Sequence, residues 1–266
     1  MVSEPYIVFS DTISFHNPGF LMSNFQFKEM DIEGCETLLA ISKADRFNRW
    51  MFETVQPYLK GNMLEIGSGI GNISQYFLDN KQQITVSDLR ENYLHFLRKK
   101  FSAYSNLRGI YNLDLIDPEF EQKHAQILNS FDSVFALNVI EHIENDGLAL
   151  TNCKKLLKPG GTLLILVPAF MQLYNSLDRE LFHFRRYSRS MLQNQVINAG
   201  FSIKKSFYFN ALGIPAWIVG GWFSKTKTIS SSQMNAYNKL IPLARIGDRL
   251  TGNLLGLSVI TVATNQ

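Results

Sequence analysis

The residues of this sequence whose spacing most clearly indicates chemistry are Glu65, Gly67, Gly69 and Gly71. They close a short apolar run, so the pattern predicts a buried strand that turns tightly into a helix. Glycines at every second position let backbone N–H groups approach a ligand closely. The pattern therefore predicts a cofactor-binding loop, with a tight turn that binds nothing as the alternative.

Two further acids each end a predicted strand. Asp88 ends the strand at residues 83–88, about 20 residues after Gly67, where an acid that binds ribose hydroxyls is expected. A carboxylate suits this task because it accepts two hydrogen bonds from a vicinal diol. Asp114 ends the strand predicted at residues 107–114. The alternatives are a solvated strand-end acid for Asp88 and a helix N-cap before Pro118 for Asp114.

The elements that must position these residues alternate between strands and helices. Further strands are predicted at residues 131–138, 162–168 and 201–209, and a Leu-Lys-Pro-Gly-Gly turn precedes the second of them. Alternation of this kind favours an α/β fold with a mainly parallel sheet. With 266 residues, 45% of them hydrophobic, the chain can bury one large core.

Residues 62–168 resemble class I S-adenosylmethionine-dependent methyltransferases in the order and spacing of these motifs. The glycines do not follow the dinucleotide fingerprint G-x-G-x-x-G, because Asn72 stands where its third glycine would be. The resemblance implies a Rossmann-like, doubly wound, mainly parallel seven-stranded sheet with an antiparallel C-terminal strand. It also implies helical lid elements at the N-terminus and after the fifth strand.

On this basis we expect an N-terminal cap at residues 1–60 and a methyltransferase domain at residues 61–266, with a substrate-binding insertion at about 169–190. The implied cofactor is S-adenosylmethionine. In the family the glycine loop wraps its amino-acid end, and Asp114 corresponds to the residue that accepts the adenine amino group. The cofactor-binding residues implied are Glu65, Gly67, Gly69, Gly71, Asp88, Asp114 and Asn138.

Substrate chemistry is expected from the loop after the fourth strand and from the insertion. A hydroxyl acceptor must lose its proton, and histidine is the usual base at neutral pH, so His142 and His183 are the catalytic candidates. Alternatively, His142 orients its loop, and His183 caps a helix or pairs with Asp178. The candidate substrate-binding residues are Trp50, Glu141, Tyr174, Asp178, Arg185, Arg186 and Tyr187.

The two arginines have two interpretations. Arg185 and Arg186 could hold a carboxylate or phosphate of the acceptor, or they could pair with Asp178 and Glu180 to keep the insertion closed. We expect one arginine in each role. No required metal is predicted, because Asn138 replaces the first acid of the Glu-x-x-Glu-His motif that ubiquinone-pathway O-methyltransferases carry here.

Asn-Arg-Trp at residues 48–50, Glu-His at 141–142, and Asp178, His183 and Arg-Arg-Tyr at 185–187 resemble a bacterial subgroup of these methyltransferases, and the similarity spans nearly the whole chain. Members of that subgroup often have uncharacterised substrates or are associated with glycan and lipid-linked sugar pathways. We therefore expect methyl transfer to a small-molecule, sugar or lipid-linked acceptor, most readily at a hydroxyl. The alternative is a protein of this fold that binds the cofactor without methylating, or uses it for another transfer.

Charge and targeting signals narrow the partners. A net charge of +3 without a basic stripe argues against a nucleic-acid partner. Residues 201–266 are nevertheless basic, with seven lysines and arginines and one acid. Residues 211–227 combine tryptophans with lysines and could make weak peripheral membrane contact. No secretion signal is recognised at the N-terminus, so a cytoplasmic location is expected.

Overall fold

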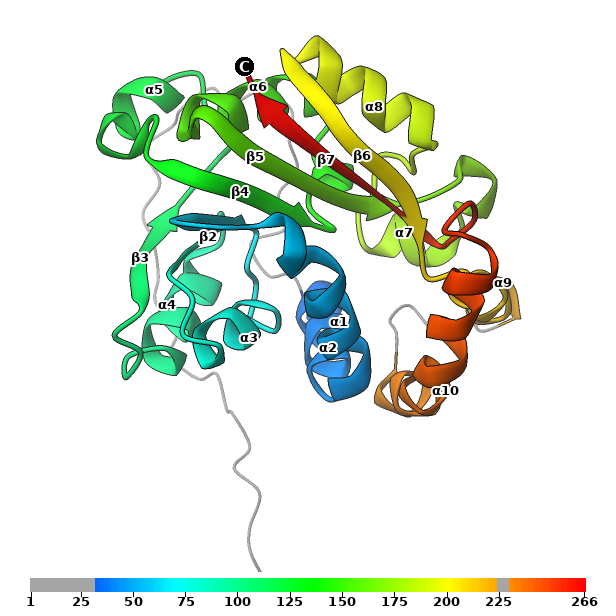
Figure 1. The fold of residues 1–266 in the computed structure, drawn as a ribbon. Helices are drawn as coiled ribbons and strands as arrows, with labels where there is room; N and C mark the ends of the chain where they lie inside the picture. Colours follow the sequence, from blue (N-terminus) through cyan, green and yellow to red (C-terminus); the bar gives the residue numbers. More distant parts are fainter. Residues whose placement is uncertain (1–31, 224–229) are drawn as a thin grey trace, which may run out of the picture. The chain divides into compact units, whose positions relative to one another are not determined.

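The computed structural model describes residues 32–223 and 230–266, and within them seven strands form one sheet (Figure 1). The strand order is β3-β2-β1-β4-β5-β7-β6. The bounds are β1 (Met63–Ile66), β2 (Ile84–Asp88), β3 (Leu107–Asn112), β4 (Phe131–Leu137), β5 (Leu157–Pro168), β6 (Phe201–Phe209) and β7 (Ser258–Asn265).

Strands β1 to β5 pair in parallel, and β7 runs antiparallel to both of its neighbours, β5 and β6. The predicted doubly wound sheet with an antiparallel C-terminal strand is therefore confirmed. The carboxyl ends of β1, β2, β4 and β5 meet at one edge, which is where open α/β sheets bind ligands.

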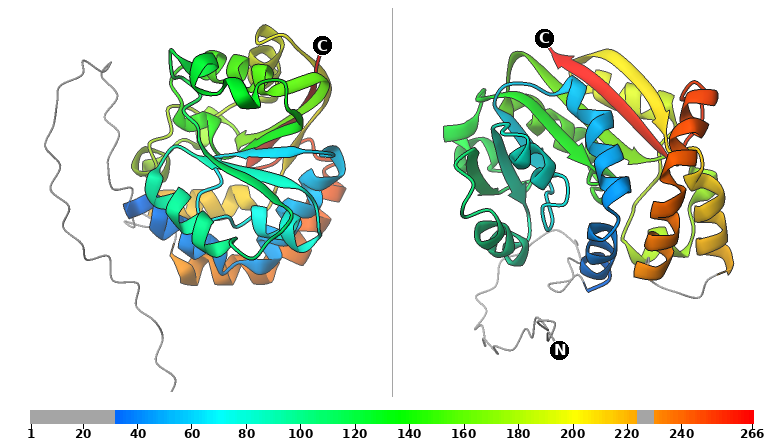
Figure 2. Two further views of the ribbon diagram at one scale, coloured as in Figure 1. Left: turned by 90° about the vertical axis from the view of Figure 1, so that its left-hand side faces the viewer. Right: turned by 60° about the horizontal axis from the view of Figure 1, so that its bottom comes forward.

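Helices cover both faces of this sheet (Figures 1 and 2). The longer ones are α1 (Ile32–Ser42), α2 (Asp45–Val55), α4 (Glu91–Lys100), α6 (Asp146–Leu156), α8 (Arg189–Asn198), α9 (Gly213–Phe223) and α10 (Ser231–Leu250). The shorter ones are α3 (Ser74–Asp79), α5 (Phe120–Lys123), α7 (Ser176–Glu180), η1 (Gln56–Tyr58), η2 (Ala125–Ile127), η3 (Ile140–His142) and η4 (Met171–Leu173).

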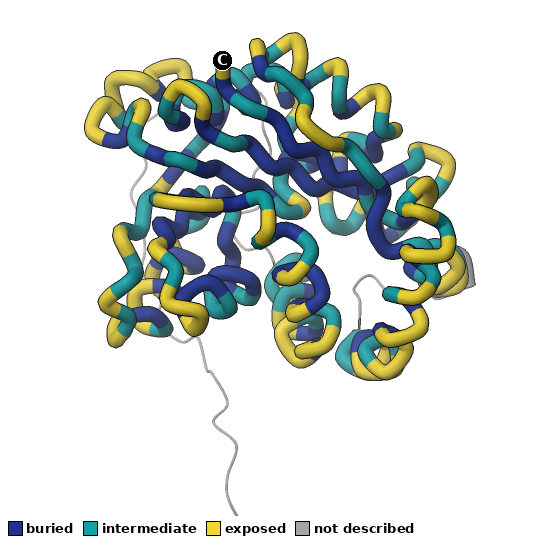
Figure 3. The backbone as a smooth tube through the Cα atoms, viewed as in Figure 1, coloured by how far each residue is buried: buried dark blue, intermediate teal, exposed yellow. Residues whose placement is uncertain are grey.

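The core divides into two layers because strand side chains alternate between faces. Leu64, Val134 and Leu163 point toward α6 and α8, whereas Phe135 and Leu164 point toward α2, α3, α4 and α10. The central strands are accordingly the most continuously buried part of the backbone (Figure 3). This double coverage explains why their sequences are uninterrupted apolar runs.

Strand β5 is longer than predicted, since it begins at Leu157 and not at Thr162. Its pairing with β4 shifts register between Phe131, opposite Leu157, and Ser133, opposite Thr162. Residues 158–161 bulge out of the pairing between these two points, and Gly160 has a φ of +74°. The predicted turn thus interrupts a strand, whereas we expected it to precede one.

The described part of the predicted N-terminal cap comprises α1, α2 and η1. From Ile32 onward these elements belong to the same compact unit as the sheet, and residues 1–31 lie outside the described residues. The cap as a separate segment stays a prediction. The predicted insertion at 169–190 contains η4, α7 and the start of α8.

Candidate functional site

The glycine loop follows β1 directly, and Gly67, Gly69 and Gly71 all have positive φ angles, of 67°, 53° and 73°. At Gly67 a Cβ atom would lie 2.5 Å from Cγ2 of Val139, which follows β4. A side chain is excluded there by both backbone conformation and space. Because Gly67 has no side chain, the loop after β1 can pack closely against Val139 in the loop after β4.

Asp88 lies at the end of β2 and ties this loop to its neighbour. Its Oδ2 accepts the N–H of Gly69 at 2.9 Å, and its Oδ1 accepts the N–H of Arg90 at 3.0 Å. The side chain is buried, and burial raises the pKa of Asp88 despite these bonds. Each carboxylate oxygen can accept a second hydrogen bond, so a diol can still bind.

Glu65 is buried in β1 and accepts a hydrogen bond from the hydroxyl of Ser74, the first residue of α3. Burial raises the pKa of Glu65 to about 7, with the Ser74 hydroxyl acting in the opposite direction. The carboxyl group thus connects the strand before the glycine loop to the helix after it.

The remaining predicted cofactor residues follow the carboxyl ends of β3 and β4. Asp114 is half-buried, and its Oδ1 accepts the N–H of Ile116 at 3.0 Å. The N-cap position of helix α5 is occupied by Glu119 and not by Asp114, so the N-cap alternative for Asp114 is not what the structure shows. Asn138 is exposed, with a φ of +56°, and its backbone N–H donates to Leu166.

Asp178 organises the insertion after β5. Its Oδ1 lies 2.8 Å from both Nδ1 of His183 and Nε of Arg186, and its Oδ2 accepts the N–H of Asn175 at 2.9 Å. Burial alone would raise the pKa of Asp178, but the His183 and Arg186 contacts outweigh it and hold that pKa below its ordinary value. Arg186 also donates to the carbonyl of Ala169 at 3.2 Å.

The two catalytic candidates come together, although 41 positions separate them in the chain. The rings of His142, in η3, and His183 are edge-to-face with centroids 4.6 Å apart. Beside them Glu141 is 0% exposed, and neither of its carboxylate oxygens has a hydrogen-bond partner among the described residues. Burial raises the pKa of Glu141 to about 8, and burial followed by His183 lowers the pKa of His142 to about 3.

Other predicted substrate residues are engaged within the protein. Arg185 pairs with Asp146 at 2.8 Å, and the same carboxylate accepts the hydroxyl of Tyr187 at 2.8 Å. Tyr174 donates to the carbonyl of His183 at 2.7 Å. Arg186 pairs with Asp178, one of the two acids considered, and Arg185 pairs with Asp146, so both arginines form ion pairs inside the protein.

Sequence reasoning missed Trp217 of α9, whose indole lies under the Arg186 guanidinium, 4.5 Å from Cζ to the ring centroid. Trp217 also donates to the carbonyl of Leu173, in η4. No spacing rule connects these residues, so only the tertiary structure shows that α9 covers the insertion.

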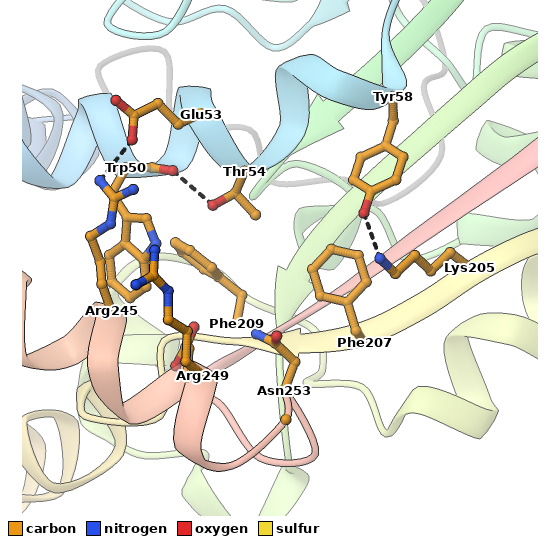
Figure 4. A pocket seen from close by; sticks show the side chains of 12 residues that line it. Trp50, Glu53, Thr54, Tyr58, Lys205, Phe207, Phe209, Arg245, Arg249 and Asn253 are labelled. Carbon is orange, nitrogen blue, oxygen red and sulfur yellow. Dashed lines mark hydrogen bonds and ion pairs between the residues drawn. The ribbon is translucent and has the colours of Figure 1, made fainter.

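Trp50 lies apart from this group. It is 5% exposed and packs on Phe209, with ring centroids 4.3 Å apart. Both rings line a cavity of about 350 Å³ between α2, β6 and α10, which Tyr58, Lys205 and Arg249 also line (Figure 4). None of the other predicted site residues lines this cavity.

Residues 64–163 match the family model described as a methyltransferase domain. The chain contains a methyltransferase domain. Its fold is that of the class I enzymes.

The methyltransferase domain is similar to short segments of much longer curated proteins. It is 30% identical over 113 residues to lovastatin diketide synthase lovF of Aspergillus terreus, and 32% identical over 129 residues to the hybrid PKS-NRPS synthetase thnA of Trichoderma harzianum. These matches cover 40% and 46% of this chain but only 4% and 3% of the relatives. The chain thus spans a few per cent of their length.

Solved structures share the fold at low identity. A chain of the complex between the Trm112 methyltransferase activator and a methyltransferase from Haloferax volcanii is 14% identical, with a TM-score of 0.58 over 88% of this chain and 97% of that one. Phosphoethanolamine N-methyltransferase 2 of Haemonchus contortus, in complex with S-adenosyl-L-methionine, is 20% identical. Its TM-score is 0.53, over 82% of this chain and 52% of that one.

The segment for which membrane contact is predicted, residues 211–227, is only partly described. Helix α9 covers residues 213–223, and residues 224–227 lie outside the described residues. In residues 32–223 and 230–266, none of the helices combines the length and apolar character needed to cross a bilayer. Peripheral contact stays a prediction.

Proposed function

We propose that this protein transfers a methyl group from S-adenosylmethionine to a hydroxyl of a small-molecule acceptor. The observation that carries the proposal is the meeting of His142, His183 and Glu141. These residues follow the carboxyl ends of β4 and β5. Val139, two residues before Glu141, packs against Gly67 and so brings the group next to the glycine loop. Polar side chains that converge next to a cofactor loop are what an acceptor site requires.

For the cofactor, we assign the amino-acid end to the loop of Gly67, Gly69 and Gly71 and the ribose hydroxyls to Asp88. The structure fits this assignment because Asp88 already fixes the loop through the N–H of Gly69. Asp114, Asn138 and Glu65 complete the assigned set: Asp114 takes the adenine end, Asn138 lines the edge of the site, and Glu65 supports the loop from behind. When bound, the cofactor supplies a methyl group already activated on a sulfonium.

For the acceptor, the protein must align the hydroxyl, exclude water and remove a proton. His183 is the better base of the two histidines, because Asp178 accepts from its Nδ1 and leaves Nε2 as the proton acceptor. The low pKa of His142 keeps that ring neutral, so it acts as a hydrogen-bonding neighbour. Tyr174, Arg185, Arg186 and Tyr187 hold the insertion in place around the acceptor.

A small molecule as acceptor is supported by the relatives named above, whose names refer to polyketide and peptide synthases. A sugar or a lipid-linked intermediate belongs to the same proposal, since either presents hydroxyl groups. We assign no nucleic-acid partner and propose that the reaction takes place in the cytoplasm.

The test is calorimetric titration of the purified chain with S-adenosylmethionine and S-adenosylhomocysteine, followed by acceptor screening for S-adenosylhomocysteine release. We expect micromolar binding that falls at least 30-fold in Asp88→Ala and is unchanged in Glu121→Ala, an exposed acid on α5 that pairs with Lys155. A folded wild-type chain that binds neither compound would refute the proposal. Binding without methyl transfer to any hydroxyl acceptor would favour the non-methylating alternative.

A further inference from the structure

The buried carboxylate of Glu141 has no hydrogen-bond partner among the described residues. The side chain is 0% exposed, and both oxygens are without a hydrogen bond in the part of the chain that the structure describes. Burying a polar group without a partner costs several kcal/mol, and an ionised carboxylate costs more. A buried group of this kind indicates a ligand that the polypeptide does not itself provide.

Two imidazoles lie next to this carboxylate. One ligand atom each from Glu141, His142 and His183 lies within 4.8 Å of the other two. Two atoms bound to one ion at about 2.1 Å are separated by roughly 3 to 4 Å, so the three side chains need to close by about 1 Å.

The outer contacts of both histidines suit metal ligation. Nδ1 of His183 is bonded to Asp178, which leaves Nε2 for an ion. The backbone of Leu181 and Phe182 interacts electrostatically with the His142 ring. A carboxylate or carbonyl on the far nitrogen is the usual support of a histidine ligand. Arg186 is the cation that acts electrostatically on Glu141, and Asp178 already neutralises it.

We propose that Glu141, His142 and His183 bind one divalent transition-metal ion. Two imidazoles and one carboxylate form a donor set typical of zinc and ferrous iron, and they leave open positions for a further ligand. Magnesium is disfavoured because it prefers oxygen ligands. The sequence analysis predicted no metal because it compared only the short motif around Asn138 with a known metal-binding motif. His183 is distant in sequence and joins Glu141 and His142 only in the folded chain.

If the proposed function is correct, this ion deepens it by changing how the hydroxyl is activated. An acceptor oxygen in an open position of the ion would lose its proton more readily, as metal-bound water does. His183 would then serve as a ligand and not as the base. The metal site itself does not depend on that activity, since ion binding is measured without acceptor or cofactor.

The test uses Co²⁺ as the probe, because its visible absorption reports coordination directly. We expect the chelator-treated wild type to bind one Co²⁺ per chain, with d–d bands, and Zn²⁺ to displace it. Affinity should fall at least 30-fold in Glu141→Gln and His183→Ala. It should be unchanged in His95→Ala, which removes an exposed histidine outside the cluster.

Glu141→Gln is nearly isosteric and keeps the fold testable if His183→Ala unfolds through loss of the Asp178 contact. Absence of Co²⁺ bands in the wild type, or equal affinity in Glu141→Gln, overturns the metal site. A parallel titration with S-adenosylmethionine in chelator separates the two proposals. Cofactor binding with no metal binding refutes only the metal site, and metal binding without cofactor binding refutes only the proposed function.

Discussion

Arg186 and Asp178 form an ion pair that is almost completely shielded from water. The guanidinium Nε lies 2.8 Å from the carboxylate Oδ1, and the side chains are 1% and 0% exposed. Because Arg186 also reaches the carbonyl of Ala169, just after β5, the pair fastens the insertion to the sheet. The position of His183 therefore depends on a charge pair outside the acceptor site.

Replacing Asp178 with Asn should destabilise the protein by about 3–5 kcal/mol, because it leaves the Arg186 guanidinium buried without its counter-charge. Urea denaturation provides the measurement. Glu91→Gln, which breaks an exposed pair with Arg98, is the matched control and should cost less than about 1 kcal/mol. Similar losses for the two variants would contradict a structural role for the buried pair.

Two glycines with similar backbone conformations should respond differently to alanine. Gly67 (φ +67°) would place its Cβ 2.5 Å from Val139, whereas a Cβ at Gly160 (φ +74°) has no atom within 4 Å. Gly160→Ala should lose only the roughly 1–2 kcal/mol of left-handed strain. Gly67→Ala should lose more stability and bind S-adenosylmethionine at least tenfold more weakly. Calorimetry measures the binding and thermal unfolding measures the stability of each variant. Equal losses in Gly67→Ala and Gly160→Ala would show that the contact between the two loops is unimportant.

Glu65 should make stability depend on pH in a definite direction. Its folded pKa of about 7 lies above the ordinary value of 4.5, so the folded state retains a proton that the unfolded state releases in this window. The contribution to stability is complete below pH 4.5 and is lost as pH rises to about 7, by up to about 3 kcal/mol.

Glu65→Gln removes that titration. The stability of this variant relative to the wild type should therefore increase between pH 4.5 and 7, as measured by urea denaturation at several pH values. Glu121→Gln, on the exposed surface, is the control. A flat difference between Glu65→Gln and the wild type would contradict the raised pKa.

Trp50 either stabilises the core or contacts the substrate, and substitution distinguishes these two roles. Because it is buried against Phe209, Trp50→Ala should cost about 3–5 kcal/mol and Trp50→Phe clearly less. With Trp50→Phe, the KM of any acceptor identified should stay at its wild-type value. A several-fold rise in KM with unchanged thermal stability would instead support the substrate contact predicted from the sequence.

The sequence was sufficient for the strands and for the cofactor loop because both are local patterns. Apolar runs predicted β2 and β4 to within one residue, and the glycine spacing located the loop that Asp88 holds. The bulge in β5 escaped prediction because Gly160 leaves the pairing without ending the strand. Local sequence does not specify whether an excursion of this kind is a turn or a bulge.

The partners of the insertion could not be predicted, because they are fixed by tertiary packing. Asp146, at the start of α6, forms an ion pair with Arg185 and accepts a hydrogen bond from Tyr187. Trp217 of α9 stacks on the guanidinium of Arg186. Which acid meets which base is decided only when β4, β5 and α9 are in place.

The position of β7 has a consequence for how the protein is made. Among the described strands, β6 pairs only with β7, which lies between it and β5. As the ribosome releases residues 201–209 first, β6 emerges with no strand to pair with until residues 258–265 follow. A nascent chain stalled in this interval exposes the open edge of β5 and an unpaired aromatic strand, and both features favour aggregation.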